Sequence, residues 1–140
     1  MSRIFWDTNL FIYLFEDFGV LSERTAQLRT AMRARGDQLL TSTLTLGEVL
    51  VKPCEKHDDD LYRKYETGIS SNALLIPFDE KAAKIYATLR CDRSLRAPDA
   101  IQFACAASVR VDLFLTNDAR LAGKVVEGIQ FISSLERSPI

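Results

Sequence analysis

Apolar residues occur in short blocks along the chain, and their spacing distinguishes strands from helices. Short, mainly apolar runs predict buried strands, and these lie at 4–6, 38–41, 73–76, 111–115 and 129–132. Segments with apolar residues three or four positions apart predict amphipathic helices, at 9–15, 22–35, 43–53, 57–68, 79–89 and 99–108. Gly36 is placed to end the second of these helices and Pro53 to end the third.

The predicted strands and helices alternate along the chain. This alternation favours a parallel sheet that helices cover on both faces. We therefore expect an α/β fold, a three-layer α/β/α sandwich with a central, mainly parallel sheet of four or five strands. No repeat, low-complexity tract or linker-like stretch divides the sequence, so we interpret residues 1–140 as a single domain.

The charge balance limits how a nucleic acid could be held. The chain has 18 basic and 19 acidic residues and a formal charge of −1, so any such partner must be bound locally. Cys54, Cys91 and Cys105 are odd in number and widely spaced, which fits neither a disulfide framework nor a zinc site. The first residues do not resemble a signal peptide, and the apolar runs are too short to cross a bilayer. We expect a cytoplasmic protein with no membrane partner.

Four acidic residues stand where strands end or helices begin. Asp7 directly follows the first strand, and Glu48 lies in the first turns of the helix after the second strand. Asp99 lies just inside the helix that leads to the fourth strand, and Asp118 follows that strand. In right-handed βαβ units these positions share the carboxyl edge of the sheet, where open α/β sheets bind ligands.

Each of these acids also has a purely structural interpretation. Asp7 and Asp118 could cap helices, and Thr45 and Glu48 match a capping box. Asp99 could interact favourably with the positive end of a helix dipole. An acid at a helix N-terminus gains about 0.3–1 kcal/mol, whereas two carboxylates 4 Å apart repel by about 4 kcal/mol at an effective dielectric of 20. A cluster of all four therefore needs a divalent cation, and oxygen-only ligands favour Mg²⁺, with Mn²⁺ able to substitute.

The motifs around the four acids resemble those of PIN domains over nearly the whole chain. They are Asp7-Thr8-Asn9-Leu10, Glu48 within 42–50, Ala97-Pro98-Asp99-Ala100 and Leu115-Thr116-Asn117-Asp118. The size and layout are similar to VapC-like toxins of toxin–antitoxin pairs. This resemblance implies a metal-dependent endoribonuclease that cleaves RNA, a small cognate antitoxin as partner, and a homodimer.

The acids and their polar neighbours receive roles in this hypothesis. Asp7, Asp99 and Asp118 would ligate the metal directly or through water, and Glu48 would complete the site, either as a further metal ligand or by orienting a bound water. Hydroxyls and amides nearby could hold the carboxylates or a water in register; the candidates are Thr8, Asn9, Ser42, Thr116 and Asn117. For Asn9 and Asn117, turn geometry alone is an equal alternative.

Three arginines near the acids are candidate RNA contacts. Arg93 and Arg96 precede the helix of Asp99, and Arg120 lies just past Asp118. The alternative for each is a solvated surface charge.

Other functions remain open at this stage. A PIN nuclease of RNA processing and a PIN-like binding module without catalysis would share the fold. A phosphoryl-transfer enzyme could use Asp7 as nucleophile, although Asn9 and Arg3 do not supply the second acid and the lysine that such sites need.

Overall fold

The centre of the protein is a parallel sheet of five strands in the order β3-β2-β1-β4-β5. The structure is a computed structural model that describes residues 1–140. The strands are β1 (Arg3–Trp6), β2 (Gln38–Ser42), β3 (Leu74–Ile76), β4 (Leu113–Thr116) and β5 (Phe131–Ser134). The predicted α/β fold with a central parallel sheet is therefore confirmed.

Alternating residues of the strands face two separate cores. Neighbouring strands are paired so that Phe5 lies beside Leu40 and Phe114, while Ile4 lies beside Leu39 and Leu113. Successive side chains of a strand point to opposite faces. The Phe5 set belongs to one buried cluster of 16 residues and the Ile4 set to another of 14, so the sheet is buried on both sides.

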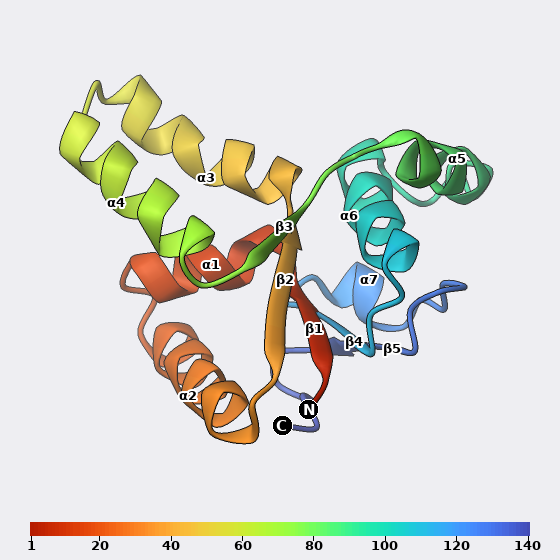
Figure 1. Cartoon of the computed structure of the whole chain (residues 1–140), viewed down its shortest axis with the longest axis horizontal. Coiled ribbons are helices and arrows are strands. Elements are labelled where there is room, and N and C mark those ends of the chain that lie inside the picture. Colours follow the sequence, from red (N-terminus) through yellow and green to blue (C-terminus); the bar gives the residue numbers. More distant parts are fainter.

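Helices cover both faces and complete the three layers (Figure 1). The Ile4 side is covered by α1 (Thr8–Phe15), α2 (Val20–Arg35), α3 (Thr43–Glu55) and α4 (Asp59–Ser70). The Phe5 side is covered by α5 (Glu80–Leu89), α6 (Ala97–Ser108) and α7 (Ala119–Ala122). No helix is long and apolar enough to cross a membrane.

Some boundaries differ from the predicted ones. The helix expected to end near Pro53 continues to Glu55, because a proline near the end of a helix removes a single N–H donor. The next helix begins at Asp59 rather than His57, since the Asp58 side chain accepts a hydrogen bond from the Leu61 N–H and caps it. The short α7 was not predicted, because four residues show no periodicity.

The strand order creates a switch point between β1 and β4. The chain adds β2 and β3 on one side of β1, and β4 and β5 on the other. Connections therefore leave the carboxyl ends of these two central strands in different directions, and such a crevice is where open α/β sheets bind ligands. Asp7 directly follows β1, and Asp118 lies two residues past the end of β4.

Candidate active site at the switch point of the sheet

Asp7 is fixed at the centre of the switch point. Its backbone N–H donates to the Leu115 carbonyl at 2.9 Å, which continues the pairing of β1 with β4. The side chain caps α1 by accepting a hydrogen bond from the Thr8 N–H at 2.9 Å, and its other oxygen accepts from the Thr116 hydroxyl at 2.7 Å. The Gln102 amide also donates to Oδ1, at 3.5 Å, so Asp7, with 9% of its surface exposed, is a buried carboxylate that three donors orient.

The environment of Asp7 favours its protonated form. Burial raises its pKa from 3.8 to about 6, against the hydrogen bonds from Thr116 and Thr8, which lower it. The negative charges of Asp99 and Glu48 contribute smaller parts of this rise. Carboxylates that are 92 and 41 positions away in the sequence therefore act on Asp7 through space.

Glu48 points toward this site and does not form the capping box that its spacing suggested. The Ser42 hydroxyl accepts from the Thr45 N–H at 3.3 Å and caps α3. The carboxylate of Glu48 instead accepts a hydrogen bond from the Thr8 hydroxyl at 2.7 Å. Glu48 is thus connected to the residue that follows Asp7.

Asp99 and Asp118 share one arginine. Asp118 caps α7, and its carboxylate pairs with the guanidinium of Arg120, whose Nε lies 3.0 Å from Oδ1. This pairing lowers the pKa of Asp118. Arg120 Nη2 also lies 4.0 Å from Asp99 Oδ2, and Arg96 Nε lies 3.4 Å from the same oxygen. Two of the predicted RNA contacts are therefore ion-pair partners of the acids, whereas Arg93 is exposed and unpaired.

A buried polar network below the acids was not predicted. The amide of Gln102 donates to the Thr45 hydroxyl at 2.8 Å and to the Thr8 hydroxyl at 3.0 Å, and accepts from the Ser42 hydroxyl. Thr41 donates to the Trp6 carbonyl at 2.8 Å, so the hydrogen bond at 2.9 Å between Thr41 and Thr45 must be donated by Thr45. The Thr8 hydroxyl donates to Glu48, and the hydrogen bonds of Gln102 tie α6 to α1 and α3.

The sequence offered one signal for Gln102. It lies three residues after Asp99, on the same face of a helix whose other buried residues, apart from Ser108 at its end, are apolar. A long polar side chain in such a position needs buried partners.

The other predicted supporting residues divide into two groups. Thr8 and Thr116 contact carboxylates directly, as described above, and Ser42 acts through Gln102 and the α3 cap. Asn9 Oδ1 accepts from the Asn117 N–H at 3.4 Å, and Asn117 Nδ2 donates to the Tyr13 hydroxyl at 2.8 Å. These two asparagines connect α1 to the loop after β4 and form no hydrogen bond with the four acids.

The donor chemistry of the site fits a hard divalent cation. Asp7, Glu48, Asp99 and Asp118 offer carboxylate oxygens only, which suits Mg²⁺ or Mn²⁺. The like charges around Asp7 are those that a cation would relieve. In the side-chain arrangement of the structure, however, no three acidic, histidine or cysteine residues converge closely enough to hold an ion. The Arg120 guanidinium supplies the positive charge beside Asp99 and Asp118.

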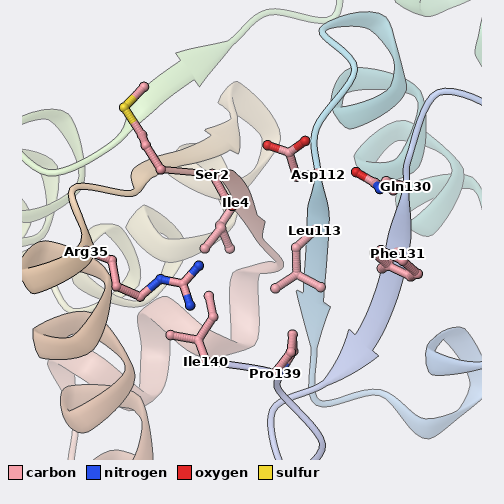
Figure 2. Close-up of a pocket in the computed structure, with 10 residues that line it drawn as sticks. Ser2, Ile4, Arg35, Asp112, Leu113, Gln130, Phe131, Pro139 and Ile140 are labelled. Atoms are coloured by element: carbon pink, nitrogen blue, oxygen red, sulfur yellow. The ribbon is translucent and has the colours of Figure 1, made fainter.

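Several cavities lie outside the acidic centre. One of about 540 Å³ adjoins Asn117 and is lined by α7 and by the end of β5. Another of about 230 Å³ lies at the amino ends of the strands, beside Ile4, Leu113 and Phe131 (Figure 2). There Asp112 accepts from the Arg3 N–H, and Arg35 pairs with Asp37. This second cavity is therefore at the edge opposite to the acids.

Fold and site together define an α/β domain with carboxylates at the switch point of a parallel sheet. The chain belongs to the PIN domain family, which matches residues 4–125. No curated protein sequence matches the chain.

Several solved structures share the fold over almost the whole chain. A chain of VapBC2 from Rickettsia felis, bound to a promoter DNA fragment, has a TM-score of 0.75 at 14% identity, covering 94% of this chain and 98% of the other. DNA-bound VapBC from Salmonella typhimurium gives 0.73 at 19% identity, covering 96% and 99%. A toxin–antitoxin complex from Klebsiella pneumoniae gives 0.64 at 25% identity, covering 90% and 94%. The expected similarity to VapC-type PIN domains is thus confirmed.

Proposed function

We propose that this protein is a metal-dependent endoribonuclease that hydrolyses phosphodiester bonds of RNA, with Mg²⁺ as the cofactor and Mn²⁺ able to replace it. The observation that carries this proposal is the buried carboxylate of Asp7 at the switch point, whose pKa is raised by burial and, in addition, by the charges of Asp99 and Glu48. A stable fold alone gives no reason to place the charges of Asp99 and Glu48 near Asp7, because both raise the free energy of its ionised form. Binding of a divalent cation beside a phosphodiester would give such a cluster of carboxylates a function.

The chain's own residues would prepare the site for hydrolysis. Asp7, Asp99 and Asp118 would hold the cation, which when bound supplies positive charge for the phosphate in the transition state. Thr116 fixes one oxygen of Asp7 and the Thr8 N–H fixes the other, so this ligand cannot rotate freely.

Glu48 would orient the attacking water. Its carboxylate is exposed at the surface of the site, and the Thr8 hydroxyl holds one of its oxygens. An exposed, hydrogen-bonded carboxylate can accept a hydrogen bond from water and take its proton as the water oxygen bonds to phosphorus. The bond from phosphorus to the leaving ribose oxygen breaks in the same displacement, and solvent protonates that oxygen.

The biological role that we propose is the toxin of a type II toxin–antitoxin pair. The Klebsiella pneumoniae structure that shares the fold is described as a toxin–antitoxin complex. We accordingly expect a small antitoxin protein to bind and inhibit this chain in the cytoplasm. A homodimer stays a prediction.

A cleavage assay with purified protein tests the proposed activity. Single-stranded RNA labelled at its 5′ end is incubated with Mg²⁺, with Mn²⁺ or with chelator, and the same DNA sequence serves as a parallel substrate. We expect internal cleavage of RNA only with metal, and a loss of about a hundredfold or more in Asp7→Asn. Asp59→Asn, at an exposed position in the first turn of α4, is the matched control and should cleave normally.

Two results would contradict the proposal. Equal cleavage with chelator would exclude metal dependence. Binding of RNA without cleavage under every metal condition would instead favour a PIN-like binding module.

A further inference from the structure

The guanidinium of Arg120 lies between two of the four acids. Its Nε is 3.0 Å from Asp118 Oδ1, Nη2 pairs with Oδ2 of the same carboxylate, and Nη2 is 4.0 Å from Asp99 Oδ2. Asp99 belongs to α6 and Asp118 caps α7, so the arginine links elements on either side of the site. The side chain of Arg120 is 56% exposed and can leave this position without disturbing the core.

The position of Arg120 differs from that of the other arginine at the site. Arg96 forms an ion pair with Asp99 only, at 3.4 Å, and acts on Asp118 through its charge without pairing with it. Arg120 follows Asp118 by two residues on the same short helix, so it remains near both acids even when its ion pairs break.

In this side-chain arrangement no three acidic, histidine or cysteine residues form a cation site. With the guanidinium paired to Asp118, the oxygens of that carboxylate are directed toward Arg120. A dication and a guanidinium would also repel each other strongly at such short range. The two cations cannot share the same carboxylate oxygens.

We propose that Arg120 is an internal counter-cation, which neutralises Asp99 and Asp118 in the metal-free protein and must be displaced before a divalent cation binds there. The inference rests on the proposed function, because it takes these acids to be metal ligands. It changes the role expected for Arg120 from a simple RNA contact to a competitor of the metal. The concentration of metal at which the site fills is then set partly by this arginine.

Metal affinity measures the competition directly. Mn²⁺ binding to the full chain is followed by calorimetry, with the free ion measured by electron paramagnetic resonance. We expect Arg120→Gln to bind Mn²⁺ about fivefold more tightly than the unmodified protein, the upper range for a partly exposed ion pair. Arg120→Lys keeps the charge but loses the two-pronged geometry, so an intermediate affinity is expected.

Arg63→Gln is the matched control. Arg63 is an exposed arginine that pairs with an aspartate three residues away, as Arg120 pairs with one two residues away, but it lies on α4. Its replacement should leave Mn²⁺ affinity unchanged. A second measurement on the unmodified protein is the ¹⁵N–¹H signal of the arginine Nε groups, where the peak missing in Arg120→Gln should shift on addition of Mg²⁺.

The outcomes separate this inference from the proposed function. The role of Arg120 as a counter-cation would be refuted if Arg120→Gln bound Mn²⁺ as tightly as the unmodified protein or more weakly. It would also be refuted if Mg²⁺ bound without shifting the Arg120 Nε signal. An unmodified protein and an Arg120→Gln variant that both fail to bind Mn²⁺ would refute the metal site itself, and the counter-cation with it.

Discussion

Replacing Asp7 by asparagine removes the one buried charge at the switch point while keeping the shape of the side chain. The pKa of Asp7 rises from 3.8 to about 6 in the folded protein, and each pKa unit corresponds to about 1.4 kcal/mol. The ionised form thus destabilises the metal-free fold by up to about 3 kcal/mol at neutral pH. Asparagine can still accept from the Thr8 N–H and donate to the Thr116 oxygen, so most of this energy should be regained.

The assay is denaturation by heat and by urea, with chelator present, across a range of pH. At pH 7.5 we expect the metal-free Asp7→Asn variant to melt up to about 10 °C higher, at about 3 °C for each kcal/mol in a domain of this size. Because the folded pKa lies above the unfolded one, the contribution of Asp7 is fully present below pH 3.8 and is lost as the pH rises through about 6. The stability of Asp7→Asn should not fall in this way as the pH rises.

The control for this prediction is Asp59→Asn, which replaces an exposed aspartate and should change the melting temperature little. A lower melting temperature in Asp7→Asn would show that ionised Asp7 does not destabilise the fold. A decline in the stability of the variant between pH 4 and 6 as large as that of the unmodified protein would show the same.

Two further predictions concern the groups that hold the acids. Gln102→Leu leaves the Thr45 hydroxyl without its donor in the core, so we expect a loss of about 2–3 kcal/mol in urea denaturation; a change below about 0.5 kcal/mol would show that the network does not stabilise the fold. Thr116→Val removes the hydroxyl that stabilises ionised Asp7, so the acid limb of RNA cleavage should move to higher pH by about one unit. An acid limb at an unchanged or lower pH would show that the ionisation of Asp7 does not control RNA cleavage.

The layout of the fold could be predicted because it depends on local pattern and on topology. Each of the five expected strands occurs, and the alternation of Ile4, Phe5 and Trp6 between two cores follows from the pleat of a strand. Placing Asp7 and Asp118 near one edge required only that β1 and β4 be parallel. Those expectations needed no knowledge of side-chain partners.

The partners themselves could not be predicted, because they come from distant segments. The spacing of Thr45 and Glu48 matched a capping box, yet the Ser42 side chain caps α3 and the Glu48 carboxylate accepts a hydrogen bond from Thr8. Thr8 is 40 positions away from Glu48, and only the packing of α1 beside α3 brings them together. The ion pairs of Arg120 with Asp99 and Asp118 likewise depend on the tertiary fold, which brings Arg120 of α7 near the start of α6.

The most direct test of a shared metal centre is anomalous X-ray scattering from crystals grown with Mn²⁺. We predict an anomalous peak for a manganese ion within bonding distance of oxygens of Asp7, Asp99 and Asp118. The Arg120 guanidinium should be turned away from Asp118. Crystals of an active preparation that show no such peak at the switch point, or show it at another part of the molecule, would contradict the account.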